Sequence, residues 1–279
     1  MTGISYMKMD LSHLLVTLTL FSTGLQAAEW GYWGKNGPEN WPGICTTGKK
    51  QSPIDISTKD AIKINFGPVN FGRYDMSFYA TVKNNGHTVE IKLHGVPPYI
   101  SGANLQSAYI FEQMHFHWGA EHTVDGLRGP LELHLVHYDK QYANVSIAAQ
   151  HENGIVVVSV LFELSKHDNP QLKSIVKATR EVSYKVGKST TIQAKLIPSK
   201  LLPKDRAYYY YQGSLTTPAC EESVLWFVLM KRCTVSTAQI NVFKRLIGDH
   251  GRLTFNNRPT QELNGRKVYH YYLERFMRQ

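Results

Sequence analysis

The sequence has little cysteine, no extended basic run and no apolar run long enough to cross a membrane. Its cysteines, Cys45, Cys220 and Cys233, are far apart and lack C-x-x-C spacing, which disfavours a thiolate metal site. The net charge is +9, but Lys and Arg are scattered along the chain, so we expect no nucleic-acid partner. Internal repeats, low-complexity linkers and breaks in composition are also missing, which favours a single domain.

The amino-terminal segment has the pattern of a signal peptide. Residues 14–21 are largely apolar, a lysine precedes them, and Ala27 and Ala28 offer small residues for cleavage. The run is shorter than the roughly 20 apolar residues of a membrane span. A buried N-terminal helix is the alternative, and it is disfavoured because the run has no polar face. We therefore expect a signal peptide at 1–27 and a mature domain at 28–279.

A secreted protein matures in an oxidising compartment, and this changes how the cysteines are interpreted. One disulfide and one free thiol is the simplest arrangement of three cysteines, but the sequence does not select the pair. The triplet that begins at Asn144, "NVS", is an N-glycosylation sequon that fits the same compartment. We expect an extracellular glycoprotein with one disulfide.

The middle of the chain has the sequence pattern of a β protein. Short apolar or alternating runs are separated by turn signals such as "NNG", "DG" and "ENG", which predicts strands at 87–93, 109–118, 131–138, 145–151 and 154–164. Helical spacing of apolar residues behind a capping residue predicts helices at 169–182 and 236–247. The expected fold is mainly β with a few short helices, built as one domain around a central sheet.

The run "EQMHFHW" suggests a metal site. Residues i and i+2 of a strand point to the same face, so His115 and His117 project side by side. A third imidazole is available from His134, on the next predicted strand after a loop long enough to return the chain antiparallel. Three imidazoles with an open fourth position suit a catalytic zinc, although imidazole also binds copper, iron and nickel.

Several motifs together identify a family. "QMHFHWG", "EHTVD", "ELHLVH" and "GSLTTP", with "WGYWGKNGPENW", "QSPIDI", "NNGH" and "NNRPTQ", resemble the α-class carbonic anhydrases in order and spacing over nearly all of the mature chain. The resemblance implies a mostly antiparallel, twisted sheet with a conical active site that holds one zinc. It also implies reversible hydration of carbon dioxide to bicarbonate and a proton, the carbonate dehydratase reaction, by attack of zinc-bound hydroxide with a histidine proton shuttle.

The resemblance assigns roles to individual residues. His115, His117 and His134 match the zinc ligands, and Gln113 and Glu132 match the residues that orient two of them. The catalytic set is His87 as proton shuttle, with Thr216 and Glu121 as the pair that orients the nucleophile. Residues matched to the proton path are Tyr32, Asn84 and Asn85. Residues matched to the substrate site are Val136, Val157, Leu215, Thr216, Thr217 and Trp226.

The resemblance also selects a disulfide and a set of ligands. Cys45 and Cys220 match the disulfide of secreted and surface-anchored members, which leaves Cys233 free. We expect a monomer that binds carbon dioxide and bicarbonate and is inhibited by sulfonamides and anions. Glu90 departs from the pattern, because many relatives carry a neutral polar residue at this edge of the cleft, and Ala219 stands where a second proline is common.

The sequence also bears on two other function classes. A carbonic-anhydrase-related binding protein would keep the fold and lose catalysis, but such proteins usually lack a zinc histidine, and all three are present here. A secreted zinc hydrolase is disfavoured because the sequence has no H-E-x-x-H pattern. An active carbonic anhydrase remains the interpretation that we prefer.

Overall fold

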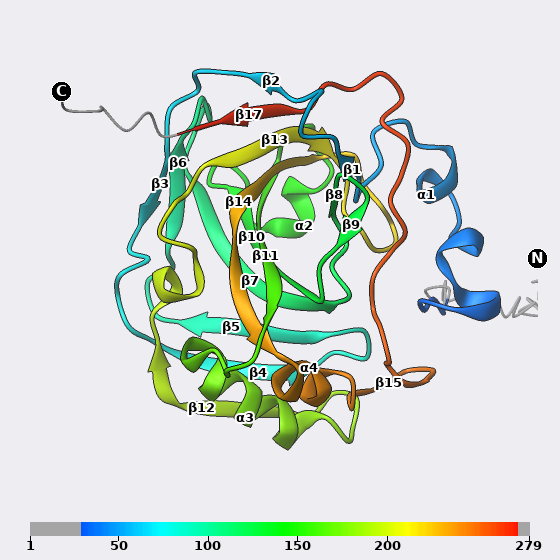
Figure 1. Ribbon diagram of the computed structural model, residues 1–279, viewed down its shortest axis with the longest axis vertical. Coiled ribbons are helices and arrows are strands. Elements are labelled where there is room, and N and C mark those ends of the chain that lie inside the picture. Colours follow the sequence, from blue (N-terminus) through cyan, green and yellow to red (C-terminus); the bar gives the residue numbers. More distant parts are fainter. Residues whose placement is uncertain (1–28, 273–279) are drawn as a thin grey trace, which may run out of the picture.

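The computed structural model describes residues 29–272, and twelve strands of this segment form one twisted sheet (Figure 1). The predicted signal peptide at 1–27 lies outside the described residues. In spatial order the strands are β12 (Ser189–Leu196), β4 (Phe78–Asn84), β5 (Val89–His94), β7 (Tyr109–Trp118), β10 (Leu131–Asp139), β11 (Ile155–Ser165), β14 (Val224–Ser236), β13 (Tyr208–Gly213), β17 (Tyr269–Tyr271) and β2 (Ile62–Lys63), with β6 (Tyr99–Gly102) joining β7 to β3 (Val69–Gly72).

The pairing in this sheet is mostly antiparallel. The exceptions are β11 with β14 and β17 with β2, which run parallel. Smaller sheets and helices surround it: β1 (Asp55–Ile56), β8 (Thr123–Val124), β9 (Leu127–Arg128), β15 (Ile247–Gly248), β16 (Gly251–Arg252), α1 (Ile44–Thr47), α2 (Val145–Ala148), α3 (Lys173–Val182), α4 (Thr237–Phe243), η1 (Gly34–Asn36), η2 (Pro38–Asn40), η3 (Pro170–Leu172) and η4 (Pro198–Leu201). The expected mainly β, single-domain fold is confirmed. Within residues 29–272, no helix has the length and apolar character that a bilayer span requires.

The two predicted longer helices form, and each is shorter than its hydrophobic pattern. Asn169 caps a 3-10 turn that leads into α3. At α4, Ser236 and Gln239 form a capping box that satisfies backbone donors at the start of the helix. Both helices lie together at the end of the sheet that carries β4 and β12 (Figure 1).

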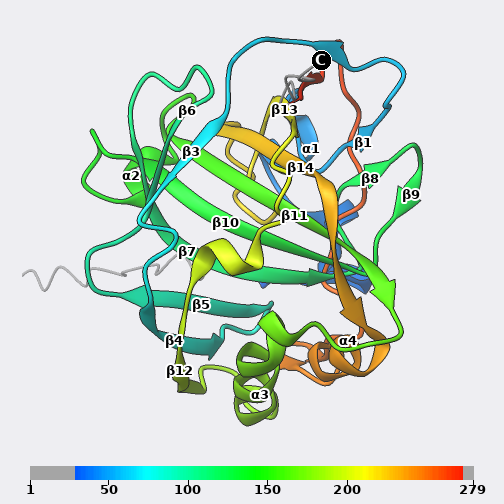
Figure 2. The ribbon, with the colours of Figure 1, turned by 60° about the vertical axis from the view of Figure 1, so that its left-hand side comes forward.

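The prediction of a strand at 145–151 is wrong, because this segment begins with helix α2. The Asn144 side chain accepts a hydrogen bond from the Ile147 backbone N–H, 3.0 Å away, which fixes the first helical turn. Ala148 and Ala149 are buried against the valines of β10 and β11. The helix lies beside β10 (Figures 1 and 2).

Alternation along three central strands, β10, β11 and β14, creates two different faces. On one face, Leu133, Val158 and Phe227 belong to the larger apolar core. On the other face, Val136, Val157 and Trp226 line a smaller cluster next to the histidines. These strands lie side by side in Figure 2. Because the first face is fully packed, it supports the second face as a rigid floor for a site.

Candidate metal centre

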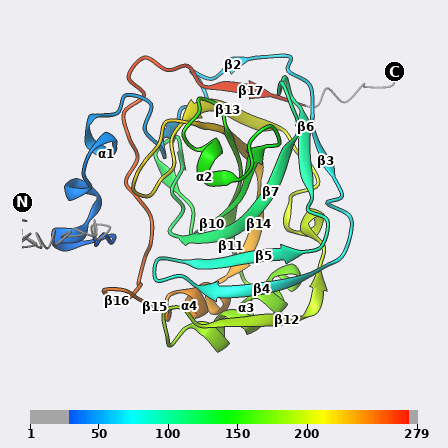
Figure 3. The same cartoon turned by 180° about the vertical axis from the view of Figure 1, so that it is seen from behind.

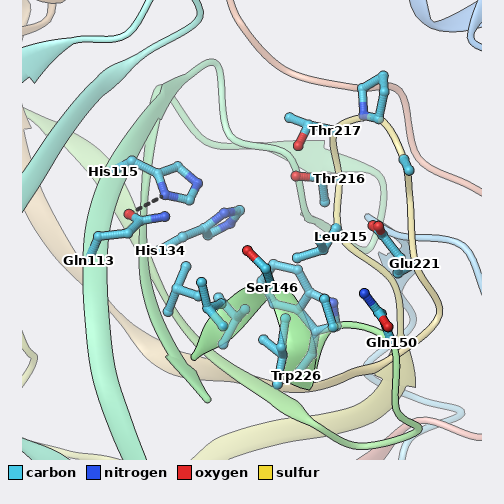
Figure 4. A pocket seen from close by; sticks show the side chains of 17 residues that line it. Gln113, His115, His134, Ser146, Gln150, Leu215, Thr216, Thr217, Glu221 and Trp226 are labelled. Carbon is cyan, nitrogen blue, oxygen red and sulfur yellow. Dashed lines mark hydrogen bonds between the residues drawn. The ribbon is translucent and has the colours of Figure 1, made fainter. Parts of the chain in front are cut away.

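Strand pairing brings His115, His117 and His134 together. His134 is directly opposite His115 across the antiparallel β10–β7 pair, and His117 lies two residues further along β7. One ring nitrogen of each histidine lies within 4.8 Å of the others. Figure 4 shows His115 and His134 pointing into the same cavity. The geometry predicted from the sequence is therefore present.

Each of the three imidazoles is held at one nitrogen by an acceptor. The pairs are His115 Nδ1 with Gln113 Oε1 at 2.9 Å, His117 Nδ1 with the Asn256 carbonyl at 2.7 Å, and His134 Nε2 with Glu132 Oε1 at 2.7 Å. Carbonyl and carboxylate oxygens only accept, so the held nitrogens carry the protons. The lone pairs are then on Nε2 of His115 and His117 and on Nδ1 of His134.

The free nitrogens fit a metal ion. His117 Nε2 is buried and has no hydrogen-bond partner among residues 29–272, an arrangement that is costly unless a cation binds there. Burial holds the pKa of His115 well below its usual range, brings that of His117 to about 4 and lowers that of His134. All three rings are therefore neutral at neutral pH, as metal ligands must be.

Glu132 is a buried hub beside the histidines. Its Oε1 accepts from His134 Nε2, from His122 Nδ1 at 2.7 Å and from the Ser159 hydroxyl at 2.7 Å. Its Oε2 accepts from the backbone N–H groups of Glu121 and His122 at 2.7 and 2.8 Å. Burial alone would raise the pKa of Glu132, but His122 and His134 hold it well below its usual range. The carboxylate is therefore ionised and fixes the His134 ring.

Glu121 and Thr216 form a second polar pair. Glu121 is fully buried, and its Oε1 accepts the Arg258 backbone N–H at 2.9 Å. Burial raises its pKa to about 7, against the opposing effects of His134, the Arg258 N–H and the Thr216 hydroxyl. Oε2 lacks a partner with hydrogen-bond geometry among the described residues, so Thr216 is the nearby hydroxyl that can satisfy it.

A cavity of about 470 Å³ lies beside His115, His134 and Thr216, which contribute to its lining. Val136, Val157 and Trp226, successive partners across β10, β11 and β14, form its apolar wall. Thr216 and Thr217 face His115 and His134 across it, with Leu215 beside them (Figure 4). Helix α2 adds Ser146 to the lining, and Gln150 follows the helix. Neither residue is predictable as lining from a strand at 145–151.

The residues predicted for the proton path lie apart from this lining. His87 is not among the described residues that line the cavity; it stacks on Trp30 with ring centroids 3.7 Å apart. Asn84 is buried, and its amide donates to the carbonyls of Val182 and Ile247. Asn85 Oδ1 accepts the backbone N–H groups of His87 and Thr88. Tyr32 is buried, which raises its pKa well above the usual value, and Glu121 adds to this rise.

The predicted disulfide forms, and Glu90 lies next to the histidine cluster. Cys45 of α1 and Cys220 form a disulfide that ties the amino-terminal segment to the loop after Thr217, and Cys233 is a half-buried free thiol. Glu90 on β5 is opposite His115 on β7, so this departure from the family pattern lies next to a predicted ligand.

Two residues that orient the site were not assigned by sequence reasoning. Asn256 supplies the carbonyl for His117, and Arg258 supplies the N–H for Glu121. Both fall in "NNRPTQ", which supported the resemblance without a stated role. The segment runs between the amino-terminal helices and the main sheet (Figures 1 and 3).

Comparisons with known proteins agree with this arrangement. The family model described as eukaryotic-type carbonic anhydrase matches residues 36–272. Carbonic anhydrase 6 of Mus musculus is 35% identical, with 95% of this chain and 93% of that protein covered. Carbonic anhydrase 3 of Homo sapiens is 34% identical, with 87% and 98% covered. Carbonic anhydrase 7 of Mus musculus is 35% identical, with 86% and 96% covered. The chain therefore belongs to the α-class carbonic anhydrases and is an enzyme of carbon dioxide hydration.

Proposed function

We propose that the enzyme works through one zinc ion held by His115 Nε2, His117 Nε2 and His134 Nδ1. The observation that carries this proposal is the set of fixed tautomers, which leaves three lone pairs converging beside the buried, unpartnered His117 Nε2. A bound zinc would lower the pKa of a coordinated water and so supply a nucleophile for carbon dioxide. Gln113, Asn256 and Glu132 keep the rings oriented for it.

Glu121 and Thr216 orient the nucleophile. An ionised carboxylate can only accept, so Glu121 accepts a hydrogen bond from the Thr216 hydroxyl. The Thr216 oxygen is then free to accept a hydrogen bond from the attacking water, which turns the lone pair of that water toward the substrate. The Arg258 N–H supports this direction because it stabilises the ionised form of Glu121.

The apolar wall receives the substrate. Carbon dioxide has no net dipole and gains little from hydrogen bonds, so Val136, Val157, Leu215 and Trp226 suit it better than polar side chains would. Thr217 borders the same space. Aromatic sulfonamides and small anions should compete there as inhibitors, and inhibition is measured by the same hydration assay.

His87 removes the proton that each turnover releases. The proton reaches it through a chain of water molecules bordered by Tyr32 and Asn85, and the hydrogen bonds of Asn84 fix the turn that carries His87. Imidazole has an ordinary pKa near neutrality and can accept and release protons in turn. In His87→Ala, kcat for hydration should fall roughly tenfold in dilute buffer, whereas kcat/KM should stay unchanged. Added imidazole should restore kcat. A parallel loss of both parameters without rescue would contradict the shuttle role.

The ligand set is tested by His134→Ala, with the exposed His167→Ala as matched control. The variant should lose most of its bound zinc and its hydration activity, because two strand histidines alone make a weak site. Metal content is measured by elemental analysis and activity by stopped flow. Full zinc occupancy in His134→Ala, or an equal loss in His167→Ala, would refute the assignment.

We also propose a secreted monomer, with residues 1–27 removed and Asn144 glycosylated. The Cys45–Cys220 disulfide supports an oxidising compartment. Asn144 is exposed, and its Oδ1 is used as helix cap, which leaves Nδ2 for a glycan. Mass spectrometry of protein secreted from a eukaryotic host should find an amino terminus at residue 28 and a glycosidase-sensitive mass at Asn144. Retention inside the cell or an unmodified Asn144 peptide would contradict this.

A further inference from the structure

The turn between β15 and β16 lies against the predicted shuttle. Asp249 Oδ2 is 3.2 Å from His87 Nε2, and the two side chains are 41% and 21% exposed. This is ion-pair distance for a protonated imidazole. Asp249 falls in none of the motifs that identify the family, and the steps proposed for the reaction do not use it.

Backbone contacts between the turn at Asn84–Gly86 and the β15–β16 hairpin hold Asp249 beside His87. The Asp249 backbone N–H donates to the Gly86 carbonyl at 3.1 Å, and the Asn84 amide donates to the Ile247 carbonyl at 2.8 Å. A Cβ on Gly86 would lie 2.2 Å from Asp249 Oδ2, and one on Gly248 would lie 2.3 Å from the Gly86 carbonyl oxygen. Both positions therefore need glycine for the hairpin to approach His87 so closely.

The neighbouring residue of the hairpin, His250, contacts the tryptophan that stacks on His87. His250 Nε2 donates to the Trp30 carbonyl at 3.0 Å, and Trp30 stacks on His87 with an interplanar angle of 13°. His87 therefore has the Trp30 ring against one face and the Asp249 carboxylate at Nε2. The charged or titratable groups that act on it are Asp249 and His250.

We propose that Asp249 is a positioning residue for His87, which keeps the imidazole on Trp30 and stabilises its protonated form. This rests on the proposed shuttle role of His87. Burial lowers the pKa of His87, Asp249 raises it, and His250 lowers it. Without the carboxylate the pKa would be lower still, and the imidazole would be a weaker proton acceptor.

The test is Asp249→Asn in the zinc-loaded enzyme, with the exposed Asp75→Asn as control. The pKa of His87, followed by NMR titration of its ring protons, should fall by roughly 0.5 unit in Asp249→Asn only. His87 accepts a proton only when neutral, so the rise of kcat with pH should move to lower pH by the same amount. The ratio kcat/KM should not change, because it does not report the proton transfer to His87. Asp249→Glu should recover part of the shift.

The double variant His87→Ala/Asp249→Asn separates the two proposals. Its kcat should equal that of His87→Ala, because Asp249 acts through the imidazole. If His87→Ala alone leaves kcat unchanged, the shuttle role is wrong. If His87→Ala lowers kcat but Asp249→Asn moves neither the His87 pKa nor the pH dependence, the shuttle stands and the role of Asp249 is overturned. An equal loss of kcat and kcat/KM in Asp249→Asn would also overturn it, because the carboxylate would then support the site as a whole.

Discussion

Replacing Glu132 by glutamine tests whether the buried carboxylate holds the site together. Five donors converge on its two oxygens, three on Oε1 and two on Oε2. Glutamine keeps the shape but has one acceptor oxygen and one NH₂ group, which can only donate. Whichever way the amide is turned, at least two of the five buried donors face another donor.

The loss can be estimated from these contacts. Each buried donor left without an acceptor costs about 1–3 kcal/mol, so Glu132→Gln should lower the unfolding free energy by roughly 2–6 kcal/mol. This is a large part of the ~5–15 kcal/mol that stabilises a typical domain. His134 also loses the partner that fixes its tautomer, and loss of such a partner lowers metal affinity by about 10–100-fold.

Two measurements separate these effects. Urea unfolding of the metal-free protein reports the cost of the unpaired donors, and competition with a chelator reports zinc affinity. Glu163→Gln, an exposed change on β11, is the control and should alter neither. If Glu132→Gln unfolds within 1 kcal/mol of the parent and binds zinc equally well, the carboxylate is not the hub that its contacts indicate.

Three further outcomes can be checked. Thr216→Ala should keep its zinc but lose on the order of a hundredfold in turnover, the usual effect of removing one oriented polar partner; unchanged turnover in the hydration assay would leave Thr216 with a loop role only. The double variant Cys45→Ser/Cys220→Ser should lower the unfolding free energy by roughly 3–5 kcal/mol, because the bond closes a long loop, and equal urea midpoints would refute this. Burial raises the pKa of Cys233 to about 11, so iodoacetamide near pH 8 should label it slowly until the protein is unfolded, as mass spectrometry can follow; rapid labelling of the folded protein would contradict its burial.

The strands that carry the site were predictable because their patterns are local. The run at 109–118 matches β7 residue for residue, and 131–138 misses only the last residue of β10. The segment at 145–151 was mistaken because a short apolar run reads equally well as strand or helix. In the structure, the Asn144 side chain caps the start of helix α2 and so favours the helix over a strand. A capping residue before so short a helix is only a weak signal in the sequence.

The histidine cluster was also predictable. The alternation of side chains along β7 puts His115 and His117 on one face, and the antiparallel pairing of β10 with β7 brings His134 beside them. The groups that orient the cluster were not predictable. The carbonyl for His117 comes from Asn256, 139 residues later, in a segment without regular structure. Asp249 reaches His87 from the two-residue turn of the β15–β16 hairpin, and no periodicity in the sequence marks either residue. Only the tertiary structure brings them to the site.

The late position of Asn256 and Arg258 has a consequence for synthesis. A ribosome that has added His134 needs on the order of ten seconds more to reach Asn256. During that time all three histidines exist, but the acceptor for His117 and the N–H donor for Glu121 do not. The nascent chain therefore carries the three histidines before it carries the groups that orient His117 and Glu121, and the proposed metal site is complete only when the segment at 256–258 has been made and lies beside β7.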